Sequence, residues 1–147
     1  MPLVYFDNCA LQRPLDDRAQ FRVRVEAEAV ETVISEIAQG RVALLSSDVL
    51  LAESGAAPNG TRQEFAALTL ALAAHTVFLS SAVEALARTY RNVGIKSIDA
   101  IHLASAVDGN ADYFCTTDDR FRKRAARANT EAMSVVTPQE LAFALGL

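Results

Sequence analysis

Two aspartates in the sequence each follow a short apolar segment that is typical of a buried strand. Asp7 comes directly after residues 3–6, and Asp118 comes shortly after residues 113–116. An ionised carboxylate at the end of a core strand is costly to desolvate unless another group pairs with it. A bound cation is the compensation that we expect, so this pair of acids indicates a metal-dependent function.

Two further acids are expected near the same edge of the fold. Glu53 lies in a predicted helix, residues 49–57, that follows a second strand, residues 42–45. Asp99 lies in the first turn of a segment, residues 98–107, that is apolar nearly all round and therefore reads as a buried helix. Ligands of open α/β sheets bind beyond the carboxyl ends of the strands. The acids expected to converge there are Asp7, Glu53, Asp99 and Asp118.

Convergence of these acids favours a hard divalent ion. Two carboxylates about 5 Å apart repel each other by roughly 3 kcal/mol at an effective dielectric constant of 20. Oxygen ligands without a set of His or Cys suit Mg²⁺ or Mn²⁺, and such ions promote phosphoryl chemistry. Each acid also has a structural explanation when taken alone: helix caps, a helix-dipole partner, or a solvated surface residue. The metal site is therefore a prediction from the combination.

Short apolar strands alternate with helical segments along the whole chain. Further strands are predicted at 77–79 and 135–136, and an apolar stripe with Gly40 beyond its end predicts a helix over 23–37. Predicted helix starts, from capping residues and capping boxes, are Thr61, Ser81, Ser97 and Thr137. Alternation of this kind is typical of a parallel sheet covered on both faces. No repeat or linker interrupts it, so we expect a single domain over residues 1–147.

The composition sets broad limits on location and partners. The chain has 147 residues, 51% of them apolar, enough for a substantial core. We expect a cytoplasmic protein, because there is no transmembrane run or signal peptide and the two Cys make no disulfide framework. The formal net charge of −4 argues against a strongly basic nucleic-acid-binding domain.

The distribution of the basic residues changes that expectation. A basic strip, predicted to be a helix over 120–128, contains Arg120, Arg122, Lys123, Arg124 and Arg127. A globally acidic protein with a local basic strip can still bind phosphates, although a solvated basic helix is the alternative.

Four segments resemble, in order, motifs of the PIN domain family of metal-dependent nucleases, which includes the toxin ribonucleases of bacterial VapBC toxin–antitoxin pairs. The segments are 4–7 (VYFD), 46–53 (SSDVLLAE), 97–106 (SIDAIHLASA) and 111–121 (ADYFCTTDDRF), of which the last two are specific. The resemblance implies a three-layer α/β/α Rossmann-like fold with a central, mostly parallel sheet. It also implies hydrolysis of RNA with Mg²⁺ or Mn²⁺.

The resemblance also implies roles for individual residues and partners. The catalytic and metal-binding acids would be Asp7, Glu53, Asp99 and Asp118. Thr116 would bond a metal-bound water, and Asn8 would support a carboxylate or a phosphate. In the ribonuclease hypothesis, the phosphate backbone of the RNA would be held by Arg120, Arg122 and Arg124. Expected partners are RNA, a cognate antitoxin protein and a second copy of the chain, with no membrane.

The sequence departs from the family where small hydroxyl residues commonly follow the first acid. Asn8 and Cys9 stand there, and we interpret Cys9 as a small core residue. Residues 13–17 look like a turn-like insertion relative to compact toxins. His102 shares a helix face with Asp99, where it would either hydrogen-bond a carboxylate or fill the core. Tyr90, between two arginines, is the candidate for stacking on a base.

Two other functions fit parts of the pattern. A PIN-like fold could be a non-catalytic module that binds nucleic acid or a partner. A phosphotransfer domain would also place Asp at strand ends, but Cys9 stands where a phosphatase has its second Asp. In addition, Lys96 and Lys123 lie outside the predicted strands, whereas a receiver domain needs a Lys on one. We therefore disfavour phosphotransfer.

Overall fold

The computed structural model describes all 147 residues, and its centre is one parallel five-stranded sheet in the order β3-β2-β1-β4-β5. The strands are β1 (Leu3–Phe6), β2 (Ala43–Ser47), β3 (His75–Val77), β4 (Tyr113–Cys115) and β5 (Ser134–Val136). Every strand pair is parallel, where a mostly parallel sheet was predicted. Three of the four residues of β1 have no exposed surface, so the central strand is the middle of the core.

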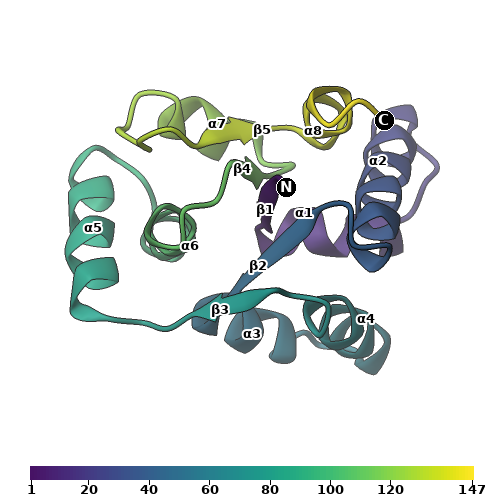
Figure 1. The fold of residues 1–147 in the computed structure, drawn as a ribbon, viewed down its shortest axis with the longest axis horizontal. Helices are drawn as coiled ribbons and strands as arrows, with labels where there is room; N and C mark the ends of the chain where they lie inside the picture. Colours follow the sequence, from purple (N-terminus) through teal and green to yellow (C-terminus); the bar gives the residue numbers. More distant parts are fainter.

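Helices cover both faces of this sheet, which confirms the three-layer α/β/α prediction. Figure 1 shows α5, α6 and α7 on one side of the sheet and α2, α4 and α8 on the other. The helices are α1 (Asn8–Gln12), the 3₁₀ helix η1 (Arg13–Leu15), α2 (Phe21–Ala38), α3 (Asp48–Gly55), α4 (Gly60–Leu70), α5 (Ser81–Asn92), α6 (Ser97–Asp108), α7 (Asp119–Ala125) and α8 (Pro138–Ala144).

The predicted apolar stripe of α2 packs into the core. Ala27, Val30 and Ile37 are buried, and Val33, between the last two, is buried with them. Gly40 has φ +76°, the left-handed conformation that ends helices and that glycine adopts without strain. None of the helices combines the length and the apolar character that a bilayer crossing requires.

Only one of the four predicted helix starts is confirmed as an N-cap. Thr137 caps α8 in a complete capping box with Glu140. The other N-caps are Asn59, Ser80 and Lys96, where Thr61, Ser81 and Ser97 were predicted. Asn59 and Ser80 each accept a backbone N–H three residues on, from Arg62 and Val83 respectively. Adjacent residues can both cap, so the path of the preceding chain decides which one does.

The strand order reverses beside β1. The chain runs β1, β2, β3 toward one edge, and then crosses through α5 and α6 to place β4 on the other side of β1. In open α/β sheets the ligand site lies at the carboxyl edge of such a switch point. The backbone N–H of Asp7 donates to the carbonyl of Cys115 at 3.2 Å, which ties the end of β1 to the end of β4.

Candidate metal and nucleic-acid site

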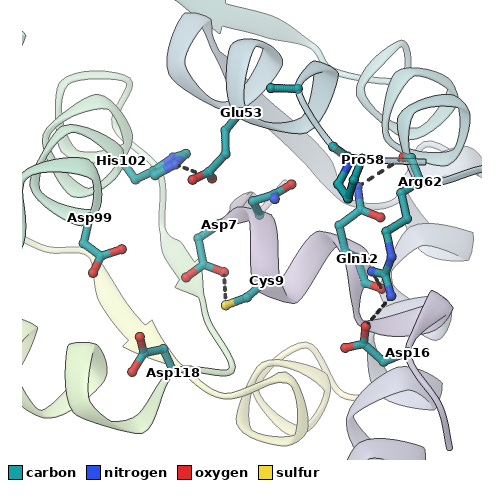
Figure 2. A pocket seen from close by; sticks show the side chains of 13 residues that line it. Asp7, Cys9, Gln12, Asp16, Glu53, Pro58, Arg62, Asp99, His102 and Asp118 are labelled. Atoms are coloured by element: carbon teal, nitrogen blue, oxygen red, sulfur yellow. Dashed lines mark hydrogen bonds and ion pairs between the residues drawn. The ribbon is translucent and has the colours of Figure 1, made fainter. Parts of the chain in front are cut away.

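Four carboxylates meet at the carboxyl edge of the sheet, each delivered by a different element. Asp7 and Asp118 are N-caps, of α1 after β1 and of α7 after β4, and accept the backbone N–H of Ala10 and Phe121. Glu53 comes from α3, which follows β2, and Asp99 from the first turn of α6. All four line one cavity of about 540 Å³ (Figure 2). The expected convergence of the acids therefore occurs.

The acids share a cavity without closing around one point. Figure 2 shows the carboxyl groups of Glu53, Asp99 and Asp118 arranged around that of Asp7. No group of three or more His, Cys, Asp or Glu side chains stands close enough together to hold a metal ion. The donor set, all carboxylate oxygens, fits Mg²⁺ or Mn²⁺. Coordination would therefore require these side chains to turn toward one another.

Asp7 is the most buried of the four acids, with 6% of its surface exposed. Its Oδ1 accepts the backbone N–H of Ala10 and the thiol of Cys9, both at 3.0 Å, and the Thr116 hydroxyl also favours its ionised form. These hydrogen bonds offset only part of the desolvation, so burial raises the pKa of Asp7 above its ordinary value. An ionised Asp7 in this cavity therefore favours a nearby cation.

Asp99 shows the mutual repulsion of the site. Its carboxylate accepts no hydrogen bond within the chain, and burial raises its pKa. The negative charges of Asp118 and Glu53 raise the pKa further, and the electrostatic influence of His102 and Lys96 offsets only part of this shift. In the metal-free protein these carboxylates destabilise one another.

Replacing Asp99 with Asn is expected to stabilise the metal-free protein at neutral pH. The folded-state pKa of Asp99 lies above its unfolded value near 3.8. The favourable contribution of this group is therefore complete below that pH and is lost as the pH rises through the folded-state pKa. Thermal unfolding in EDTA should show a higher Tm for Asp99→Asn at pH 7 and no gain at pH 3.5. Glu64→Gln, which removes an exposed charge on α4, should show no such gain, and an equal gain in both variants would contradict the repulsion.

A buried hydrogen-bonded chain orients Glu53. His102 Nε2 lies 3.0 Å from Glu53 Oε1, and its Nδ1 lies 2.6 Å from the Tyr5 hydroxyl, which in turn is 2.7 Å from Ser47 Oγ. Burial raises the pKa of Tyr5 well above its ordinary value, so the phenol keeps its proton. When Tyr5 donates to Nδ1, the imidazole proton sits on Nε2 and points at Glu53. His102 thus fulfils both expectations, because it is buried and it bonds a carboxylate.

The residues beside Asp7 differ from their sequence interpretation. Cys9 is exposed and lines the cavity, so the prediction of a core residue is wrong. The first turn of α1 directs Ala10 and Leu11 into the core and leaves Cys9 outside it. Although the residue as a whole is exposed, its sulfur is desolvated beside Asp7. This desolvation and the charge of Asp7 raise the pKa of the Cys9 thiol to about 12, which keeps the thiol a donor. Asn8 lines the same cavity, and Thr116 is buried with its Oγ1 accepting the backbone N–H of Asp118 at 3.0 Å.

Two of the three predicted phosphate-binding arginines adjoin the acids. Arg120 and Arg124 line a small cavity of about 60 Å³ that also includes Asp99 and Asp118. Lys96, which precedes α6, lines it too, although the sequence did not predict a phosphate-binding role for this residue. Arg122 faces elsewhere, 3.6 Å from Asp119.

The residue predicted to stack on a base is buried in the core. Tyr90 is 1% exposed, and its hydroxyl donates to the backbone carbonyl of Asn129 at 2.7 Å. The prediction that Tyr90 stacks on a base is therefore wrong. The flanking arginines gave no indication of the direction of the ring, which points from α5 into the core.

Residues 13–17, predicted to be a turn-like insertion, form η1 and a chain of ion pairs. Arg13 contacts Asp16 and Glu26, each at 2.8 Å, and Asp16 also contacts Arg62 of α4 at 2.7 Å. Glu26 is 1% exposed although it carries a carboxylate. The chain continues from Glu26 through Arg22, Asp119 and Arg122. The segment thus ties α2 and α4 together beside the cavity, and Arg22 of α2 extends the series to α7.

Comparisons with known proteins agree with this fold. A family model described as "PIN domain" matches residues 6–127. No curated protein matches the chain. Among solved structures, the fold is similar to a chain in the crystal structure of VapBC2 from Rickettsia felis bound to a DNA fragment from their promoter. The TM-score is 0.63 at 11% identity, over 92% of this chain and 98% of that chain, so the likeness is one of fold.

Proposed function

Because this chain belongs to the PIN domain family, we propose that it is a Mg²⁺- or Mn²⁺-dependent endoribonuclease that hydrolyses RNA phosphodiesters. The observation that carries the proposal is the meeting of four carboxylates from four separate segments in one cavity. The proposed catalytic and metal-binding residues are Asp7, Glu53, Asp99 and Asp118. A single domain covering the chain is part of the proposal.

The chain's own residues divide the work of the site. When bound, a divalent ion lowers the pKa of a water molecule, and its positive charge stabilises the in-line transition state. Asp7 is oriented by the Ala10 N–H and the Cys9 thiol, and Glu53 by His102. Thr116 stands between Asp7 and the backbone of Asp118, where its hydroxyl would position a water. Arg120 and Arg124, next to the acids, would bind phosphate oxygens of the strand.

We further propose a VapC-like role in the cytoplasm, with a cognate antitoxin and a second copy of the chain as partners. An apolar surface beyond β3 supports a protein partner, because Phe78 and Leu79 are 71% and 52% exposed. Beside them a cavity of about 320 Å³ is lined by Val49, Val77 and Ile101, among others. Light scattering of the purified chain, alone and with the product of the adjacent reading frame, would test both partners.

The alternative is a PIN module that binds nucleic acid or a partner without turnover. It is favoured by one observation, that no three of the acids stand close enough together to hold an ion. Metal-dependent cleavage separates the two functions.

We expect the EDTA-treated protein to leave single-stranded and structured RNAs intact and to cleave them after addition of Mg²⁺ or Mn²⁺. The reason is that four ionised carboxylates repel a phosphodiester until a cation neutralises them. Denaturing electrophoresis of end-labelled RNAs would measure the products, and the metal-free sample controls for metal-independent ribonucleases. Failure to cleave any RNA with either ion would reject the enzyme, and retained binding would then favour the module.

A further inference from the structure

The cavity that contains the acids extends beyond them to a second group of polar residues. Figure 2 shows Gln12, Asp16, Pro58 and Arg62 gathered on the side of Asp7 away from Asp99. Arg62 is the one Lys or Arg among the residues that line this cavity, and its side chain is 27% exposed. Nothing in the proposed metal chemistry uses this arm of the cavity.

The 13–17 segment holds the Arg62 guanidinium in place. Its Nη2 donates to Asp16 Oδ1 at 2.7 Å and to the backbone carbonyl of Leu15 at 3.4 Å, and its Nη1 donates to the carbonyl of Gln12 at 3.5 Å. The Nε–H has no acceptor within the chain. A guanidinium that is oriented and still has a free donor is well suited to a phosphate oxygen.

The ion pairs leave positive charge over. Along the chain that starts at Arg62, four arginines alternate with three acids, so one positive charge is not neutralised. The members in order are Arg62, Asp16, Arg13, Glu26, Arg22, Asp119 and Arg122. The acids of the same cavity oppose an anion in the arm, so a phosphate at Arg62 would bind when a divalent ion neutralises those acids.

The same arm contains a second, independent indication of a ligand. Gln12 is 5% exposed, lines the cavity, and its side-chain oxygen has no hydrogen-bond partner. Its side-chain nitrogen donates to the backbone carbonyl of Arg62 at 3.2 Å, which fixes the amide beside the guanidinium. The side-chain oxygen of Asn8 is also without a partner. Buried acceptors of this kind are normally satisfied, so a ligand with N–H or O–H groups fits here.

The arm also has an apolar part. Ala56, Ala57 and Pro58, in the loop between α3 and α4, line this side of the cavity. A cation, two unpartnered acceptors and an apolar wall match the three parts of a nucleotide: its phosphate, its polar edge, and the face of its base.

Cations therefore stand on both sides of the acids. Lys96, Arg120 and Arg124 adjoin Asp99 and Asp118 on one side, and Arg62 lies in the arm on the other. A single strand that crosses the acids would present phosphates to both groups. The positions of these cations on either side of the acids thus suit a strand that crosses the site.

We propose that this arm is a nucleotide subsite, in which Arg62 binds the phosphate next to the scissile one on the side away from α7. The proposal rests on the proposed function for its substrate, single-stranded RNA. Gln12 and Asn8 then accept hydrogen bonds from the nucleotide, and the Ala56–Pro58 wall contacts its base or ribose.

The first test measures binding of a fluorescein-labelled single-stranded RNA by anisotropy with Mg²⁺, in the Asp7→Asn background to prevent turnover. We expect Arg62→Gln to weaken binding about tenfold, the size of one hydrogen bond to a charged group. The slope of log affinity against log salt should fall by about 0.7, as for one lost contact to a single strand. Arg41→Gln is the matched control, because Arg41 also pairs with an acid, Glu36, but lies outside the cavity.

The second test locates the contact on the strand. RNAs with a single neutral methylphosphonate are compared at each linkage around the cleavage site, or across the bound segment if no cleavage occurs. With Arg62 present, one linkage beside the scissile position should lose affinity on neutralisation, and Arg62→Gln should be indifferent to that linkage. An equal loss at every linkage, or no loss relative to Arg41→Gln, would overturn the proposal.

Folding and catalysis are separable in this design. Arg13 contacts the other oxygen of Asp16 at 2.8 Å, so that carboxylate keeps a partner when Arg62 is replaced by Gln. If Arg62→Gln does not fold, Arg62→Lys replaces it, because Lys keeps the charge without the planar guanidinium. Neutralising the same linkage should then cost Arg62→Lys less affinity than it costs the wild type. If no linkage beside the scissile position costs Arg62→Lys any affinity and none costs the wild type any, the subsite is rejected. If the wild type never cleaves RNA but Arg62 binds one linkage, the catalytic proposal fails and the subsite stands. If the wild type cleaves and Arg62→Gln binds like the control, the subsite fails alone.

Discussion

Replacing Asp7 with Asn is expected to lower the rate of RNA cleavage by about 10²-fold to 10³-fold, the loss typical of removing one charge-stabilising group. Asp7 is the most buried acid, and its carboxyl group faces those of the other three in the cavity. A neutral amide is a weaker ligand for a hard cation than a carboxylate. Because Asn has the same shape, it can still accept the Ala10 N–H that begins α1.

The accompanying measurements separate chemistry from folding. Burial raises the pKa of Asp7, so ionising this carboxyl costs more in the folded protein than in the unfolded chain. Asp7→Asn should therefore unfold no earlier than the wild type in EDTA, and RNA binding in Mg²⁺ should persist. Asp108→Asn, an exposed acid at the end of α6, serves as the control and should cleave normally. Undiminished cleavage by Asp7→Asn would remove Asp7 from the site.

Replacing Arg13 with Ala is expected to destabilise the fold by about 3 kcal/mol, the lower end of the cost of breaking a buried ion pair. Arg13 donates to Glu26 Oε1 through Nε at 3.1 Å and through Nη2 at 2.8 Å. Glu26 is buried, so without Arg13 its charge would depend on Arg22, which is half exposed and 3.3 Å away. Urea unfolding followed by circular dichroism would measure the free energy of unfolding.

Two further variants show whether burial is the cause. Arg18 contacts Glu31 at 2.8 Å, but both side chains are substantially exposed, so Arg18→Ala should cost less than about 1 kcal/mol. Adding Glu26→Gln to Arg13→Ala removes the stranded charge and should recover part of the lost stability. Equal effects of Arg13→Ala and Arg18→Ala would show that the buried carboxylate is not what Arg13 stabilises.

Much of the fold and the candidate site could be predicted because the relevant patterns are local. A continuous apolar run marks a buried parallel strand, so residues 3–6 and 135–136 were placed at once. The carboxyl ends of parallel strands share one edge, so the acids that follow such strands, Asp7 and Asp118, were expected on that edge, and the pairing of β1 with β4 brings them into one cavity. The same reasoning brought Glu53 and Asp99 into the cavity.

What only the tertiary structure decided depends on neighbours distant in the sequence. The core position of Tyr90, the exposure of Cys9 and the choice of Asn59 and Ser80 as caps follow from how whole elements pack. No local pattern pointed to Arg62, because its partner Asp16 lies 46 residues away.

The sequence by itself therefore determined the layers, the parallel sheet and the four acids, since an apolar period or a residue after a strand is visible within a few positions. The tertiary structure decided how those acids face one another, and it showed them sharing a cavity in which no three stand close enough together to hold an ion. It also joined residues 13–17 to α2 and α4, and α2 to α7, through ion pairs. Side-chain direction and long-range charge pairing are set by the packed chain, and no local pattern encodes them.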